Sequence, residues 1–311
     1  EIDLSTLEPL LARPSSPGNV VPVSENAGKE IYQTYIGSSA NPGLRDFAVP
    51  AMIVKGRQTH DRVSFDVNPT SRQILENLSS MGHLGDLIHA GARVHQAGCN
   101  GCIGMGQAPA TGRISLRTVP RNFPGRSGTR EDQVYLCSPE TAAASALTGV
   151  ITDPRTLDMP YPRFEEPKKV SVNTEMLLAP LDEEKARERE LEKGPNIKTL
   201  PTFDALPDRL EMPVLLKVGN DISTDEIMPA GQRVLPFRSN IEEMSKFVFV
   251  DIDSDFRDRA VSTDEPGFAV AGGANYGQGS SREHAALVPR YLGLRAVIVE
   301  SFARIHRQNL I

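Results

Sequence analysis

Short apolar runs alternate with helical stretches between residues 28 and 151, and this alternation constrains the fold more than any other feature of the sequence. Residues 63–67 and 134–136 have the apolar character and short length of buried strands. Residues 71–80 and 84–90 are expected to form helices between such strands. Strands that alternate with helices are joined by crossover connections, which produce a parallel sheet. The sequence therefore predicts an α/β fold.

Local signals define one helix of this region especially well. Ser138 can cap a helix that follows strand 134–136, Pro139 suits its first turn, and Gly149 can end it. Residues 1–160 are accordingly assigned to a first α/β domain.

The composition changes to Pro, Lys and Glu in residues 161–210, which we interpret as a linker. Its charge run, residues 182–193, is expected to be a solvated helix rather than a binding element. A strand is predicted at residues 214–218, and further apolar runs follow at 247–250, 268–271 and 296–299. Residues 211–311 are therefore assigned to a second, smaller α/β domain.

Charge and composition exclude several classes of partner. The net charge is -6 and the basic residues are scattered, so no nucleic-acid partner is expected. No apolar run of about 18 residues is available to span a membrane. An odd number of cysteines, 3, does not suit a disulfide scaffold and indicates a reducing compartment. A cytoplasmic protein is expected, and both ends of the chain look cut from something longer.

A CxxC motif lies among glycines at residues 98–104, with Cys99 and Cys102 two residues apart. A tight glycine loop can direct both sulfurs to one metal ion or cluster. A zinc ribbon would need a second CxxC pair, which the sequence lacks. Two packed thiols in a turn remain the alternative.

Arg121 and Arg126 flank a turn at residues 122–125. The planar guanidinium group grips carboxylates through two hydrogen bonds, so two arginines on one loop suit a substrate with several carboxylates. Surface ion pairs are the alternative interpretation.

A glycine-rich segment with paired serines, residues 275–284, leads into an apolar helix. Backbone N–H groups at a helix start attract anions, so one of the two serines could be held as an alkoxide-like base with Arg282 beside it. In the alternative interpretation, Ser280 and Ser281 merely cap the helix.

These three segments, in this order, resemble the aconitase family. Supporting segments are residues 14–21, 35–41, 219–227 and 301–306, so the resemblance covers nearly the whole chain. It implies a three-layer α/β sandwich followed by a smaller swivelling α/β domain, with catalytic pieces of both meeting in a cleft.

The resemblance also implies a function. The expected reaction is the hydro-lyase dehydration and rehydration of citrate and isocitrate via cis-aconitate in the tricarboxylic acid cycle, with a [4Fe–4S] cluster as Lewis acid. Cys99 and Cys102 would ligate the cluster, while Arg121, Arg126 and Arg238 would bind a small tricarboxylate. Ser280 would be the base, with Ser281 and Arg282 stabilising its alkoxide. The partner would be an amino-side portion of the same enzyme, without which the chain is expected to be inactive.

One departure affects the cluster site. Ser39 occupies the position of the family's third cluster cysteine. Either Ser39 ligates iron through oxygen, or Cys137, at the end of a predicted strand, supplies the third thiolate.

Two functional alternatives stay open. The substrate could instead be homocitrate or isopropylmalate, as in homoaconitase or isopropylmalate isomerase. The chain could also be an aconitase-like protein that has become a non-catalytic binding or regulatory module.

Overall fold

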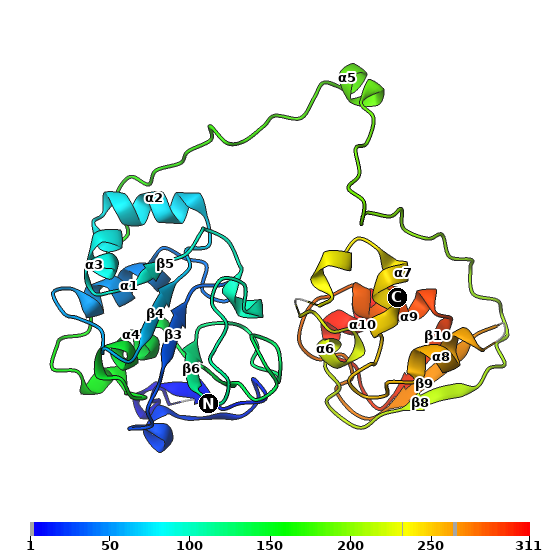
Figure 1. The fold of residues 1–311 in the computed structure, drawn as a ribbon, viewed down its shortest axis with the longest axis horizontal. Coiled ribbons are helices and arrows are strands. Elements are labelled where there is room, and N and C mark those ends of the chain that lie inside the picture. Colours follow the sequence, from blue (N-terminus) through cyan, green and yellow to red (C-terminus); the bar gives the residue numbers. More distant parts are fainter. Residues whose placement is uncertain (1–2, 232, 264–265) are drawn as a thin grey trace. The chain divides into compact units, whose positions relative to one another are not determined.

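The computed structural model describes residues 3–231, 233–263 and 266–311 (Figure 1). It divides into two compact units, Glu1–Pro180 and Leu181–Ile311. The division falls inside the segment interpreted as a linker. Each unit has its own apolar core.

The first unit is built on one mixed sheet with the strand order β2-β1-β7-β6-β3-β4-β5. Neighbouring strands from β7 to β5 run parallel, whereas β1 pairs antiparallel with both β7 and β2. The strands are β1 Leu10–Ala12, β2 Val20–Pro22, β3 Gln33–Ile36, β4 Ser64–Val67, β5 Arg93–Val94, β6 Ile114–Arg117 and β7 Gln133–Leu136.

The helices of this unit are α1 Arg45–Val54, α2 Arg72–Ser80, α3 His83–His89 and α4 Pro139–Thr148. Helix α1 packs against both α3 and α4, and α2 packs against α3. The signals that predicted α4 act as expected, since the Ser138 side chain accepts a hydrogen bond from the Thr141 N–H and Gly149 ends the helix with φ 78°. The crossover connections give β3, β4, β6 and β7 a common direction, so the loops that follow them meet at one edge of the sheet.

The second unit contains a parallel sheet with the order β10-β9-β8. Its elements are α5 Glu183–Glu188, β8 Val214–Lys217, α6 Thr224–Ile227, α7 Ile241–Met244, α8 Phe256–Val261, β9 Phe268–Gly272, α9 His284–Tyr291, β10 Leu294–Val299 and α10 Arg304–Leu310. Helix α5 lies in the predicted charge run and is fully exposed.

The apolar run at 247–250 forms a buried turn. Phe249, with φ 53°, packs edge-on against Phe256, which contacts Phe268 of β9 in the same way. The predicted α/β class is confirmed. Within the described residues, no helix combines the length and apolar character needed to cross a lipid bilayer.

Candidate functional site

The two cysteines of the CxxC motif lie in direct contact in the loop that follows β5. Their sulfurs are 3.5 Å apart, with Cys99 exposed and Cys102 buried. Cys102 lies in a single 3-10 turn, Gly101–Ile103, which ends at Gly104 with φ 78°. The predicted pairing of these thiols is therefore present in the structure.

A buried arginine fixes the middle of this loop. Arg117, at the end of β6, is fully buried and donates hydrogen bonds to the carbonyl oxygens of Gly101 (2.6 Å) and Gln107 (2.7 Å). The Gly101 N–H donates to the hydroxyl of Tyr35 at 3.0 Å. A Cβ atom at position 101 would lie only 2.1 Å from the Tyr35 ring, so this position requires glycine.

The sequence interpretation missed both Arg117 and Tyr35. A charged residue that ends the otherwise apolar strand β6 was the available signal, because buried arginines are rare unless they are hydrogen-bonded.

Polar neighbours favour a thiolate at Cys99. The pKa of Cys99 is lowered mainly by a hydrogen bond from the Cys102 thiol, and further by the N–H and hydroxyl of Ser39 and by the charge of Arg126. The pKa of Cys102 is raised because its proton is shared with Cys99 and because it is buried. Ser39 is exposed near the beginning of the loop after β3.

Cys137 does not join this pair. Its side chain packs against the apolar core of the first unit, and burial raises the pKa of its thiol. Among the described residues, no three His, Cys, Asp or Glu side chains are grouped closely enough to hold a metal ion. The hypothesis that Cys137 supplies a third thiolate is therefore wrong. Cys137 directly follows strand β7, as predicted, but its side chain packs against the apolar core.

The two arginines of the 121–126 loop act electrostatically on the thiols. Arg126 acts electrostatically on both cysteines and Arg121 on Cys102. Neither is exposed to the degree typical of a surface ion pair, since both are half-buried. The structure thus groups Ser39, Cys99, Cys102 and both arginines at the carboxyl edge of one sheet.

The thiols of Cys99 and Cys102 are of the chemical type that ligates iron–sulfur clusters. Two thiol sulfurs lie in contact, that of Cys99 exposed, and the charges of Arg121 and Arg126 would offset part of the negative charge of a thiolate-ligated cluster. Two irons of one cluster need ligand sulfurs roughly 6 Å apart. The 3.5 Å separation of the Cys99 and Cys102 sulfurs would have to increase for both to hold such a group.

In the second unit, the serine loop follows β9 and docks on the segment that precedes and begins α6. The Ser280 N–H donates to the Thr224 hydroxyl at 3.1 Å, and the Thr224 N–H donates to the Gln278 carbonyl at 2.8 Å. Asn275 donates to the Asp221 carboxylate at 2.9 Å. Because β8 and β9 are parallel neighbours, the loops after them meet at one edge.

The serines do not cap α9. The helix begins at His284, its N-cap position is Glu283, and no side-chain capping bond forms there. Ser280 is half-buried and Ser281 exposed in the loop before the helix. The capping interpretation is therefore wrong, because the first helical residue lies beyond both serines.

An ion pair holds Arg282. Its guanidinium donates to the Asp225 carboxylate at 2.9 Å and to the carbonyl oxygens of Thr224 and Met228, and both partners of the ion pair are largely buried. Asp225 and Thr224 lie in the segment 219–227, which had been noted only as support for the resemblance. Asp225 and Thr224 meet the serine loop because β8 and β9 are neighbours in the sheet, which the sequence pattern did not show.

Arg238 is tied to the same region of the second unit. The His284 ring lies 2.8 Å from the carbonyl oxygen of Arg238, and the Arg238 side chain is exposed. His284 is two residues beyond Arg282, so the backbone of Arg238 lies at the start of α9.

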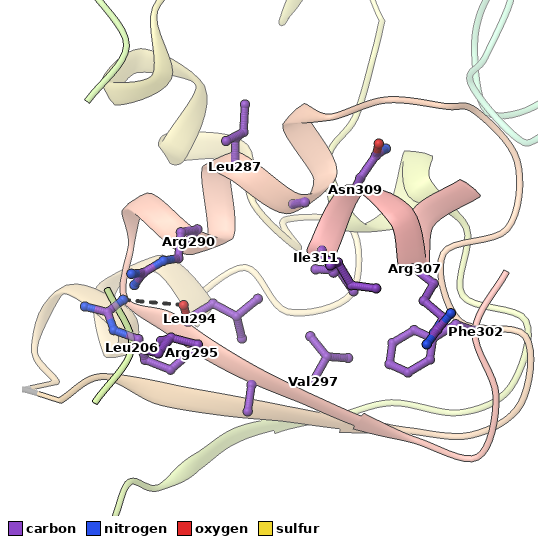
Figure 2. A pocket seen from close by; sticks show the side chains of 13 residues that line it. Leu206, Leu287, Arg290, Leu294, Arg295, Val297, Phe302, Arg307, Asn309 and Ile311 are labelled. Carbon is purple, nitrogen blue, oxygen red and sulfur yellow. Dashed lines mark hydrogen bonds between the residues drawn. The ribbon is translucent and has the colours of Figure 1, made fainter. Parts of the chain in front are cut away.

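A separate cavity of about 470 Å³ lies between α9, β10 and α10 (Figure 2). Its lining is mostly apolar, with Arg290, Arg295 and Arg307 at its margins. None of Ser280, Ser281, Arg282 and Arg238 lines it.

An α/β protein with a thiol–arginine site and a docked serine–arginine loop defines a narrow class. Residues 1–149 match the aconitase family (aconitate hydratase), and residues 224–311 match the aconitase C-terminal domain. The chain belongs to the aconitase family.

Its relatives include three kinds of enzyme. The chain is 47% identical to 3-isopropylmalate dehydratase large subunit 1 of Methanopyrus kandleri over 50% of the chain and 37% of the relative. It is 32% identical to the mitochondrial homoaconitase of Candida albicans and 29% identical to the mitochondrial aconitate hydratase of Saccharomyces cerevisiae, over the whole chain and 44% and 46% of those relatives.

The chain thus spans less than half the length of these relatives. A crystal structure of 3-isopropylmalate dehydratase from Methanocaldococcus jannaschii is 34% identical, with a TM-score of 0.27, over 32% of this chain and 53% of that one.

Proposed function

We propose that this chain is part of an aconitase-type hydro-lyase that acts on a hydroxy-tricarboxylate of the homocitrate type. This replaces the expectation of citrate and isocitrate. The homoaconitase of Candida albicans matches the whole chain at higher identity than the aconitate hydratase of Saccharomyces cerevisiae does.

The observation that carries the proposal is the immobilised serine–arginine loop. Thr224 fixes the backbone of Ser280, and Asp225 with two carbonyl oxygens fixes Arg282. A base must be held in one orientation to remove a proton efficiently, and a fixed positive charge beside it stabilises its alkoxide. We assign Ser280 as the base that removes the proton next to a substrate carboxylate, with Ser281 and Arg282 supporting it.

The thiol–arginine site, made of Cys99, Cys102, Arg121 and Arg126, would hold the cofactor and the substrate carboxylates. Cys99 and Cys102 would hold a [4Fe–4S] cluster, which when bound supplies a Lewis-acidic iron for the leaving hydroxyl. Arg121 and Arg126, whose charges act on these thiols, would orient substrate carboxylates, as would Arg238 in the second unit. The remaining acid and base groups would come from an amino-side portion of the same enzyme.

The number of arginines favours a tricarboxylate. Arg121, Arg126 and Arg238 offer three bidentate partners, which match three carboxylates. The second candidate is isopropylmalate, which has two carboxylates and an apolar branch, and the Methanopyrus kandleri relative favours it.

A substrate comparison tests the proposal. The full-length protein, loaded anaerobically with iron and sulfide, should convert homocitrate-type acids with a higher kcat/KM than isopropylmalate or citrate, measured by the ultraviolet absorbance of the unsaturated product. A preference for isopropylmalate would establish the second candidate. A loaded protein that converts none of these acids would contradict the hydro-lyase proposal and favour a binding or regulatory role.

The Ser280→Ala variant tests the assigned base. Turnover should fall about 10²- to 10⁴-fold while KM changes little, because a base acts mainly on the transition state. Near-normal turnover would remove Ser280 from the mechanism.

A further inference from the structure

Arg117 carries a positive charge into the interior of the first unit. Its side chain is completely buried, and its guanidinium donates hydrogen bonds to neutral groups. The acceptors are the Ser115 hydroxyl at 3.0 Å, the Gln33 side-chain carbonyl at 2.6 Å, and the carbonyl oxygens of Gly101 at 2.6 Å and Gln107 at 2.7 Å. Within the part of the chain that the structure describes, no carboxylate forms an ion pair with Arg117. The charge is therefore hydrogen-bonded but not neutralised.

This guanidinium stays charged at neutral pH. Burial lowers the pKa of Arg117 to about 10, while Tyr35, Asp66 and Asp132 act electrostatically in the opposite direction. The Cys102 thiol also acts on the charge of Arg117. A fixed positive charge thus lies behind the loop that contains the two cysteines, residues 98–107, which we call the thiol loop.

Arg117 and Tyr35 hold the thiol loop at a residue between its two cysteines. The Gly101 carbonyl oxygen accepts a hydrogen bond from Arg117, and the Gly101 N–H donates to the Tyr35 hydroxyl at 3.0 Å. Tyr35 and Arg117 are register partners in β3 and β6, and the guanidinium lies 5.1 Å from the centroid of the Tyr35 ring. The Tyr35 hydroxyl also bonds the Asn68 side chain, which donates to the Gln96 carbonyl at 2.7 Å. The loop backbone is therefore tied to three strands or the loops after them.

We propose that Arg117 is a positioning residue of the thiol loop and the buried counter-charge of the iron–sulfur group that Cys99 and Cys102 would hold. This inference rests on the cluster site of the proposed function. Each thiolate adds a negative charge to such a group, and reduction adds another, so a fixed cation behind the loop favours both its binding and its reduced form. Neutral acceptors keep the guanidinium in place and leave its charge available.

The same two strands carry a matched pair at their opposite edge. Arg113, directly before β6, lies 4.4 Å from the centroid of the Tyr32 ring and donates to the Tyr32 hydroxyl at 2.9 Å. Because β3 and β6 are parallel, this exposed pair lies at the amino edge of the sheet, whereas the thiol loop meets the carboxyl edge. The Arg113→Met variant therefore removes an arginine–tyrosine contact without touching the thiol loop.

The test uses the full-length natural protein and its Arg117→Met, Arg117→Lys and Arg113→Met variants. Hydrogen exchange of residues 98–107 in the iron-free proteins measures the positioning of the loop. Loading with ferrous iron and sulfide under anaerobic conditions then gives iron retention against a chelator and the reduction potential. Circular dichroism of the iron-free variants controls for misfolding.

Arg117→Met should exchange its loop amides and lose iron at least about tenfold faster than the natural protein, with a lower reduction potential. Arg117→Lys keeps the charge but cannot span the Gly101 and Gln107 carbonyls with a planar fork. It should therefore have a nearly natural potential and still exchange its loop faster. Arg113→Met should equal the natural protein in all three measurements.

The milder Tyr35→Phe variant keeps the proposal testable if Arg117→Met does not fold. It removes only the hydroxyl that accepts from Gly101, so it should speed loop exchange and leave the potential unchanged. Unchanged exchange in this variant would contradict the positioning role.

Three further outcomes would overturn the proposal. They are an Arg117→Met variant with natural exchange and potential, an Arg117→Lys variant with a potential as low as that of Arg117→Met, and a natural protein that takes up no iron. A natural protein that binds iron as predicted but converts none of the acids would contradict only the proposed hydro-lyase function. The role of Arg117 and the enzymatic assignment are thus tested separately.

Discussion

At the scale of single residues, the fixed position of Arg282 depends on Asp225. The Asp225→Asn substitution leaves a largely buried guanidinium without its counter-charge, so it should lower the free energy of unfolding by about 1–3 kcal/mol and reduce turnover. Urea unfolding and steady-state kinetics measure both effects. The matched control is Asp253→Asn, which breaks the more exposed Arg259 ion pair and should cost under about 1 kcal/mol without affecting turnover. Equal effects of the two substitutions would contradict a special role for Asp225.

A second residue, His306, should make the second unit sensitive to acid. It is buried against Tyr276, and burial lowers its pKa to about 4. The folded state therefore favours the neutral ring, so stability is complete above about pH 6.5 and falls as the pH decreases toward 4, by about 3 kcal/mol. The His306→Phe variant carries no titrating ring and should lack this part of the pH dependence in unfolding experiments. Parallel curves for both proteins would show that His306 does not titrate in this range.

At the scale of elements, the carboxyl end of α4 depends on a glycine in the left-handed backbone conformation. Gly149 has φ 78°, and a Cβ there would lie 2.6 Å from the His60 ring. Gly82, before α3, has φ 81° with nothing within 4 Å of such an atom. Gly82→Ala should cost about 1–2 kcal/mol for the left-handed conformation alone, and Gly149→Ala clearly more, as measured by urea unfolding. A larger loss for Gly82→Ala would contradict this account of the α4 end.

At the scale of the whole molecule, the segment between the two cores should be the first to be cleaved. Residues 174–202 are exposed throughout except for Pro201, and their only helix in the described structure is α5. Limited trypsin digestion should therefore cut first at Lys185, Arg187, Arg189 or Lys193, giving two resistant fragments by mass spectrometry. Early cuts within either sheet would contradict the assignment of residues 161–210 as a linker.

The sequence by itself determined the features that depend on neighbouring residues. Ser138, Pro139 and Gly149 act within one helix, so they predicted α4, and the spacing of Cys99 and Cys102 predicted their contact. Helix α9 was less well predicted, because two serines that could cap a helix instead belong to a loop held by tertiary hydrogen bonds.

Only the tertiary structure decided which distant residues meet. Strand order brings Arg117 and Tyr35 to Gly101, and it turns Cys137 toward the core. The docking of Asp225 on Arg282 likewise joins residues 57 positions apart. Local patterns fix the backbone of an element, whereas contacts between elements depend on sheet order, register and the direction of each side chain, which the sequence pattern does not specify.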